Sequence, residues 1–214
     1  MQAGHLVLTH TICGLVEEAL FPNRAVFLDR DGTLIANRHY GSDPDKIELL
    51  DGVVEGLLSL RGAGYKLVLV SNQSGVARGY FDERAVAGMH NRLQRMLERH
   101  GATLDDLEYC PHHPEGVTPP YTTECACRKP APGMLRRAAR KHGVDLSASW
   151  MIGDIEADVE AGRRAGTRTI LVGPEISQSP PDLRAKDFAE AVRYILEASR
   201  RTRDRTESEE DFHL

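Results

Sequence analysis

Short apolar runs alternate with helix-like patterns along most of this chain, and this alternation restricts the possible folds most. Each run is three or four residues long and mostly apolar, as is typical of strands buried on both faces of a sheet. The runs predict five strands, at residues 25–28, 67–70, 107–110, 150–152 and 169–172.

The segments between the runs have helical periodicity. Residues 82–100 repeat apolar side chains every three or four positions, Asp82 can cap the first turn, and Gly101 follows the last. Shorter segments of the same kind predict further helices at residues 132–142, 156–165 and 186–199.

Strands that alternate with helices indicate an α/β protein with a Rossmann-like parallel sheet flanked by helices. The length of 214 residues fits one domain with tails. We expect an N-terminal extension at 1–23, a folded domain at 24–199 and a disordered, almost wholly polar tail at 200–214. In such sheets ligands bind beyond the carboxyl ends of the strands, so the chemistry is expected in the loops that follow the runs.

Composition argues against several classes of protein. The net charge of −5 disfavours a broad basic surface for duplex nucleic acid. No apolar run approaches the ~18 residues of a membrane span, and residues 1–22 contain none of the Lys or Arg that would open a secretory signal. We expect a cytoplasmic monomer with no nucleic-acid or membrane partner.

The first run ends in two aspartates, Asp29 and Asp31, followed by Gly32. A spacing of two directs both side chains the same way while the chain stays extended. Two carboxylates that face one point repel each other and favour a cation. The alternative is a turn with solvated acids.

Three later segments carry polar groups at comparable places. Ser71 to Gly75 follows the second run and can hold an anionic oxygen, or can be an ordinary helix-capping loop. Lys129 can reach a phosphate as a compact charge, or can be solvated. Asp154 and Asp158 follow the fourth run, where they can complete an oxygen-ligand set for Mg²⁺, or cap the next helix and face outward.

A second cluster combines cysteine and histidine. Cys110, His112, Cys125 and Cys127 are a normal tetrahedral set for structural Zn²⁺, with His113 as the alternative imidazole. With four ligands no position is left for a reactive water, so the metal is expected to be structural. The other interpretation is a trio of reduced cysteines, and Cys13 has no assignable partner.

The order of these motifs resembles the haloacid dehalogenase-like phosphatase superfamily. The resemblance covers Phe27 to Leu34, Ser71-Asn72, Lys129, and Gly153-Asp154 to Asp158, over roughly residues 25–172. It implies that residues 24–199 are a Mg²⁺-dependent phosphatase domain.

The resemblance also implies residue roles. Asp29 would attack phosphorus to give an aspartyl-phosphate, and Asp31 would act as general acid and then general base. Asp29, the Asp31 backbone carbonyl and Asp154 would hold Mg²⁺. Ser71 and Lys129 would bind the transferring oxygens. Asn72 would position nearby groups, and Asp158 would support the site.

Within the superfamily the chain is similar to the branch of histidinol-phosphate and heptose-bisphosphate phosphatases. Asn72 to Phe81 and Cys127 to Pro130 carry this resemblance, and the long spacer between His112 and Cys125 favours the heptose enzymes. The 18 residues from Ile35 to Gly52 leave no room for a large lid, so we expect a capless enzyme with a zinc-binding loop.

The implied function is removal of the 7-phosphate of a heptose 1,7-bisphosphate, a small sugar-phosphate substrate. The alternatives are a histidinol phosphatase, another small phosphomonoesterase, or a zinc-stabilised binding module without catalysis. Arg128 offers a planar fork for the second phosphate, which Arg78 and Arg38 could assist. By resemblance, the substrate-contacting residues are Asn37, Arg38, His39, Tyr40, Ser71, Asn72, Gln73, Ser74, Arg128 and Lys129. The Asn-Arg-His-Tyr sequence at 37–40 and Ile155 after Asp154 depart from the family pattern.

Overall fold

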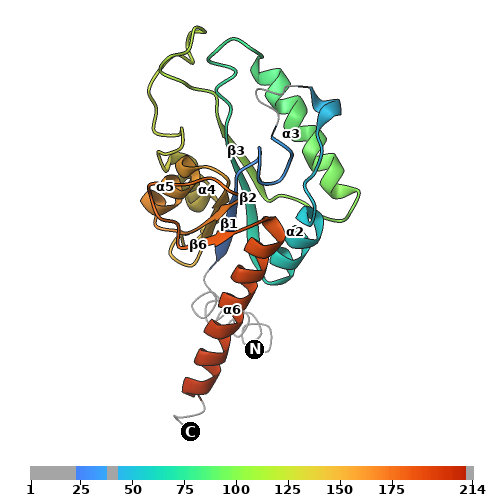
Figure 1. Cartoon of the computed structure of the whole chain (residues 1–214), viewed down its shortest axis with the longest axis vertical. Helices are drawn as coiled ribbons and strands as arrows, with labels where there is room; N and C mark the ends of the chain where they lie inside the picture. Colours follow the sequence, from blue (N-terminus) through green and yellow to red (C-terminus); the bar gives the residue numbers. More distant parts are fainter. Residues whose placement is uncertain (1–22, 38–42, 211–214) are drawn as a thin grey trace, which may run out of the picture.

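A single six-stranded parallel sheet organises the protein (Figure 1). The computed structural model describes residues 23–37 and 43–210. The strand order is β3-β2-β1-β4-β5-β6, and all five pairings are parallel, so the predicted Rossmann-like sheet is confirmed. The strands are β1 (Arg24–Leu28), β2 (Tyr65–Asn72), β3 (Asp106–Cys110), β4 (Trp150–Gly153), β5 (Arg168–Val172) and β6 (Leu183–Ala185).

Helices cover both faces of the sheet and make two apolar cores. On one face lie α2 (Val53–Gly62), α3 (Glu83–Glu98) and α6 (Phe188–Glu210), and on the other α4 (Gly133–His142) and α5 (Glu156–Ala165). Alternate residues of β1 serve the two cores: Val26 and Leu28 the first, Ala25 and Phe27 the second. This double burial is why the runs lack an apolar/polar alternation.

Two regular elements carried too weak a pattern for prediction from sequence. Helix α2 contains Gly56, which lowers its helix propensity; Gly56 is required because a side chain there would overlap the ring of Phe188. Strand β6 has only three residues at the sheet edge, too few for a periodicity. A 3-10 turn, η1 (Pro44–Lys46), was also not predicted.

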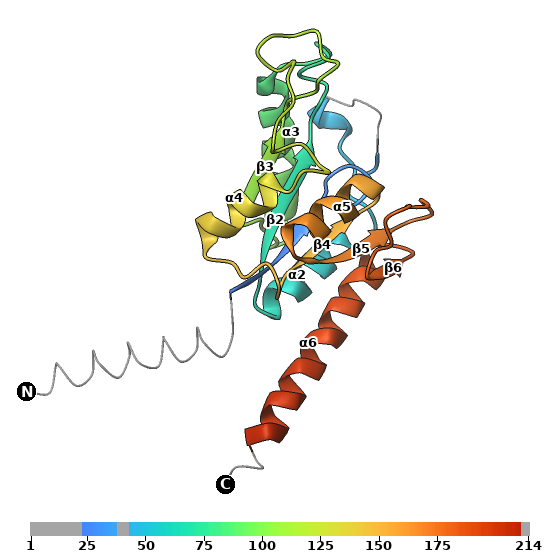
Figure 2. The same ribbon diagram turned by 90° about the vertical axis from the view of Figure 1, so that its left-hand side faces the viewer.

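The boundary predicted at residue 199 falls within α6, which continues to Glu210. Figure 2 shows this helix extending away from the sheet. Arg and Glu are good helix formers, and a helix already nucleated on a core can propagate without apolar contacts of its own. Residues 211–214 and the predicted N-terminal extension up to residue 22, with Cys13, lie outside the described residues.

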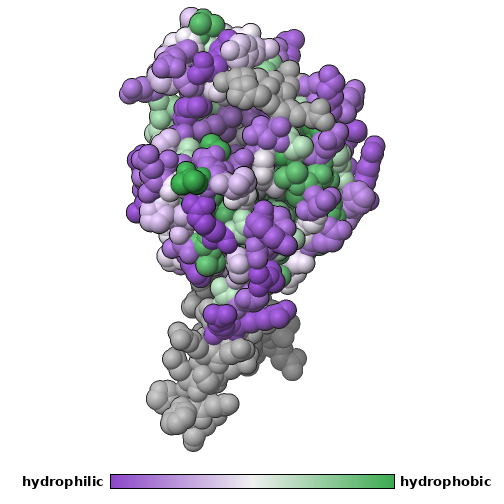
Figure 3. Space-filling view, viewed as in Figure 1, coloured by the Kyte–Doolittle hydropathy of each residue, from purple (hydrophilic) through white to green (hydrophobic). Residues whose placement is uncertain are grey.

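On the face shown in Figure 3, apolar residues form separate groups among hydrophilic ones. No helix in the described part of the chain is long and apolar enough to span a membrane. The monomeric state stays a prediction.

The strand order places the candidate chemistry at the centre of the sheet. β1 and β4 are neighbours although β2 and β3 lie between them in sequence, and this reversal of strand order is where such sheets bind ligands. Asp29 follows β1 and its backbone N–H donates to Ile152 O of β4 at 2.9 Å. Within the described residues, Ile35 to Gly52 contains only η1 as a helix, in agreement with the absence of a large lid there.

Candidate active site

Three buried or half-buried carboxylates and one lysine converge at the carboxyl ends of β1 and β4. Asp29, Asp154 and Asp158 can place one oxygen each within 4.8 Å of one another. Lys129 Nζ lies 2.5 Å from Asp29 Oδ1 and 2.6 Å from Asp158 Oδ1, and donates to Val70 O at 2.8 Å. Its side chain is 1% exposed, so this ammonium is fixed rather than solvated.

The negative charge of this cluster exceeds the positive charge that Lys129 supplies. Burial raises the pKa of Asp29 to about 8; the Lys129 ammonium opposes that shift, and Asp158 and Asp31 add to it. Burial and the Asp158 charge likewise raise the pKa of Asp154 to about 6. Burial lowers the pKa of Lys129, but the Asp158 and Asp29 carboxylates outweigh it and the net shift is upward. One lysine leaves three acids undercompensated, so the donor set fits a hard divalent cation such as Mg²⁺.

The partners of Asp158 separate its role from that of the other two acids. Asp158 Oδ1 contacts Lys129, and Oδ2 accepts from Ile155 N at 3.2 Å. Both oxygens are therefore engaged within the protein. Asp29 and Asp154 are the two side chains for which the resemblance implies a role in holding Mg²⁺, and both lie in the same carboxylate group as Asp158.

Glycines make room for these carboxylates. Gly32 has φ +87°, and a Cβ there would overlap Asp154 Oδ2. A Cβ at Gly153 would overlap the carboxyl group of Asp158. The glycines beside the two acidic motifs are thus required by close approach of carboxylate to backbone.

The segment from Ser71 to Ser74 directs its polar groups mainly to other protein atoms, including the backbone of Lys129. Asn72 Nδ2 donates to Lys129 O, and Lys129 N donates to Asn72 Oδ1, each at 3.0 Å. Gln73 Nε2 donates to Ser71 Oγ at 2.8 Å, and both residues are buried. Ser74 is partly buried. Asn72 therefore positions Lys129, and Gln73 organises the loop from within.

Arg30, which was not among the predicted site residues, holds Asp31. Its Nε and Nη2 donate to the two Asp31 carboxyl oxygens at 3.0 and 3.1 Å, and Gln73 Nε2 adds a 3.3 Å contact. Arg30 is buried although most arginines are exposed. The position of Arg30 between the two aspartates could have suggested a role in the site. The sequence alone does not show whether this side chain points into the protein or toward solvent.

The remaining predicted substrate contacts are only partly described. Asn37 is exposed, whereas Arg38, His39 and Tyr40 lie outside the described residues. Arg128 Nη1 approaches His112 O at 3.5 Å, and Arg78 Nη2 lies 3.1 Å from His113 Nε2. Arg128 and Arg78 both help to lower the pKa of His113, after burial, so these cationic side chains share one region.

The Cys/His cluster assembles as predicted. Cys110, His112, Cys125 and Cys127 bring their ligand atoms within 4.8 Å of one another. The sulfur–sulfur distances are 3.1 to 3.5 Å, and His112 Nδ1 lies 3.4 Å from Cys127 Sγ. His113 instead directs Nε2 to Arg78 and Nδ1 to the Glu115 N–H. The geometry therefore favours His112 over His113, and three sulfurs with one nitrogen fit Zn²⁺.

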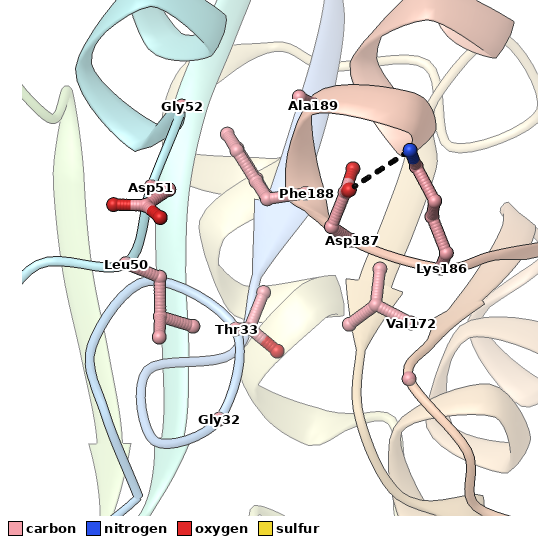
Figure 4. Close-up of a pocket in the computed structure, with 11 residues that line it drawn as sticks. Gly32, Thr33, Leu50, Asp51, Gly52, Val172, Lys186, Asp187, Phe188 and Ala189 are labelled. Carbon is pink, nitrogen blue, oxygen red and sulfur yellow. Dashed lines mark ion pairs between the residues drawn. The ribbon is translucent and has the colours of Figure 1, made fainter.

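A hollow of about 430 Å³ lies next to the first acidic motif (Figure 4). It is lined by Gly32 and Thr33, by Leu50 and Val172, and by residues 186–189 around the start of α6. Lys186 and Asp187, just before the helix, form a 3.7 Å ion pair. None of the four clustered residues Asp29, Lys129, Asp154 and Asp158 lines it. The hollow is therefore distinct from the predicted phosphate site.

Comparison with known proteins agrees with this site. A family model described as "HAD-hyrolase-like" matches residues 126–198. D-glycero-beta-D-manno-heptose-1,7-bisphosphate 7-phosphatase of Pasteurella multocida is 40% identical over 82% of this chain and 92% of its own. The protein of that name from Photorhabdus laumondii is 44% identical over 69% and 79%. The crystal structure of D,D-heptose 1.7-bisphosphate phosphatase from B. bronchiseptica, complexed with magnesium and phosphate, has a TM-score of 0.71 and 30% identity, covering 82% of this chain and 99% of that one.

The fold, the acidic cluster with its lysine, and these relatives define a phosphoric monoester hydrolase. The chain belongs to the HAD-like phosphatase family, in the branch of the heptose-bisphosphate phosphatases.

Proposed function

We propose that this enzyme hydrolyses the 7-phosphate of D-glycero-β-D-manno-heptose 1,7-bisphosphate. The observation that carries the chemistry is the buried Lys129 ammonium 2.5 Å from Asp29, beside Asp154. The sugar and its anomer are supported by the relatives above. A relative named for the alpha anomer, also from Photorhabdus laumondii, is 35% identical over 67% of this chain and 78% of its own.

The first half of the reaction is carried by Asp29. Its carboxylate attacks the 7-phosphoryl phosphorus in line, the bond from phosphorus to O7 breaks, and Asp31 gives its proton to the leaving oxygen. The product on the protein is an aspartyl-phosphate. Lys129 holds the transferring oxygens together with Ser71. Mg²⁺, when bound to Asp29, Asp154 and the Asp31 carbonyl, supplies charge that lets a carboxylate approach an anionic phosphate.

The second half regenerates the enzyme. Asp31, now a carboxylate, takes a proton from water, whose oxygen attacks phosphorus and releases Asp29 and phosphate. The Asp31 side chain is 28% exposed, against 10% for Asp29, so it is more open to the alcohol and the water. Arg30 and Gln73 keep it at the edge of the cluster.

The 1-phosphate of the substrate is proposed to bind Arg128, assisted by Arg78. Both guanidinium groups lie near His113 on the loop that contains the thiols. A guanidinium binds a phosphate through two parallel hydrogen bonds. Glu175 adds negative charge near Asp154, which disfavours a second phosphate there.

The substrate assignment is tested by kinetics on both anomers of the heptose bisphosphate beside histidinol phosphate. We expect kcat/KM for the β anomer to exceed the value for histidinol phosphate by about a hundredfold or more, since the second phosphate adds a charge-assisted contact. A preference for histidinol phosphate would contradict the sugar assignment and leave the mechanism intact. A preference for the α anomer would contradict only the assignment of the β anomer.

Removal of zinc is expected to raise KM more than it lowers kcat. The thiol cluster orders the loop bearing Arg128, whereas Asn72 holds Lys129 independently. A chelator that extracts the metal should raise KM for the bisphosphate about fivefold or more, by loss of one ordered phosphate contact. Metal analysis verifies the zinc-free state, and unchanged kinetics in that state would contradict the proposed role.

A further inference from the structure

Glu83, the first residue of α3, joins two tyrosines that flank Cys110 and His112 in sequence. Tyr109 Oη donates to Glu83 Oε1 at 2.9 Å, and Tyr121 Oη donates to Oε2 at 2.7 Å. Tyr109 directly precedes Cys110 at the end of β3, and Tyr121 lies between His112 and Cys125. We call these three residues the Glu83 clamp and residues 111–128 the zinc loop.

The clamp is built from strong contacts. Hydrogen bonds to an ionised carboxylate are stronger than neutral ones, and the N-terminus of α3 stabilises that negative charge. Both carboxyl oxygens are engaged, which fixes Tyr121 to α3.

Tyr121 passes this restraint to the thiol cluster. Its ring lies 6.2 Å from the His112 ring between centroids, and its carbonyl accepts from His113 N at 3.1 Å. The loop is tied at a second point, where Val117 N donates to Ala77 O at 2.7 Å. The long spacer between His112 and Cys125 is therefore held against the protein and not left free.

The two cationic residues that follow the cluster depend on it to different degrees. Arg128 N donates to Cys125 Sγ at 3.4 Å, and its guanidinium approaches His112 O at 3.5 Å. Lys129 is held by Asn72, Asp29 and Asp158 instead. A shift of His112 should displace Arg128 while Lys129 stays in place.

We propose that Glu83 is a positioning residue that, through Tyr121 and His112, fixes the zinc loop and aims Arg128 at the distal phosphate of the substrate. The proposal rests on the zinc site and the bisphosphate specificity proposed above. The long spacer between His112 and Cys125 would then serve to position Arg128, which lies outside the cluster of Asp29, Lys129, Asp154 and Asp158.

The test compares Tyr121→Phe, Glu83→Gln and the double variant, all loaded with zinc. Tyr65→Phe is the matched control, because its hydroxyl contacts Ser199 at 2.8 Å, on α6. We expect chelator-driven zinc release to accelerate about tenfold in both single variants, as for loss of one charge-assisted hydrogen bond. We expect KM for the heptose bisphosphate to rise about fivefold with kcat within about twofold, because uniform binding is lost. The double variant should show less than the sum of the two single effects, since both substitutions weaken the contact between Glu83 and Tyr121.

The control readout is hydrolysis of an aryl phosphate, which has no distal phosphate and whose KM should not change. The proposal would be overturned if the variants released zinc at the rate of Tyr65→Phe and had the same KM. Additive effects in the double variant would also overturn it. So would a lower melting temperature with unchanged zinc release and unchanged KM. Failure of the wild type to bind zinc would overturn it as well. If the wild type did not hydrolyse the bisphosphate, the proposed function would fail, and zinc release would still decide whether Glu83 holds the loop.

Discussion

Asp29→Asn should reduce kcat by about four orders of magnitude or more, the scale seen when a nucleophile is removed. The amide has the same shape as the carboxylate but cannot form the acyl phosphate. The fold should persist, because the change removes one of three mutually repelling acids and Lys129 keeps its contacts to Asp158 and Val70. Steady-state turnover of the bisphosphate and of an aryl phosphate measures the loss, and circular dichroism checks the fold.

A second measurement identifies the covalent step itself. Acid quenching of the wild type during turnover should trap a phosphorylated peptide containing Asp29, which the variant should lack. Asp187→Asn is the matched control, since Asn replaces Asp as a helix cap with little cost and Asp187 already accepts from Glu190 N. Retained turnover in Asp29→Asn would refute the assignment of the nucleophile.

Lys129→Met should have the second largest effect. The buried ammonium contacts Asp29 and Asp158, and its removal leaves uncompensated buried charge, at a cost of about 3–5 kcal/mol of folding stability. Loss of the cation that holds the transferring oxygens should lower kcat/KM by about a thousandfold. Because the variant lacks the lysine that offsets the acids, added Mg²⁺ should raise its melting temperature more than that of the wild type.

Lys141→Met separates this effect from general loss of a lysine. Lys141 also pairs with an aspartate, Asp106 at 2.8 Å, but its side chain is 58% exposed. Its replacement should change stability little, as for exposed ion pairs in general. Activity of Lys129→Met within about tenfold of the wild type would show that the lysine is structural and not part of the phosphate site.

The alternation of runs and helices was sufficient for prediction of the sheet and most of the helices. Helix α5 was predicted with its observed bounds, and α3 with Asp82 as its cap. The apolar pattern did not predict helix α2 or the full length of α6. In α2, Gly56 lowers the helix propensity, but its lack of a side chain leaves room for the Phe188 ring. Helix α6 continues past residue 199 because a helix that is already formed can extend residue by residue.

The acidic residues could be predicted because each follows a run at the same edge of the sheet. Their partners could not be predicted. Arg30 donates to Asp31, and Asn72 bonds the backbone of Lys129. Gln73 is buried and contacts both Arg30 and Asp31. These contacts join residues up to 57 positions apart, and no local pattern contains that information.

By itself the sequence determined the order and chemical type of the reactive groups, because these depend on residue identity and on strand ends. The tertiary structure alone decided which charged groups pair: Lys129 lies between Asp29 and Asp158, and Glu83 holds Tyr121. The physical reason is that such contacts are chosen by packing between distant segments, where burial and geometry together select one partner from several of the same type.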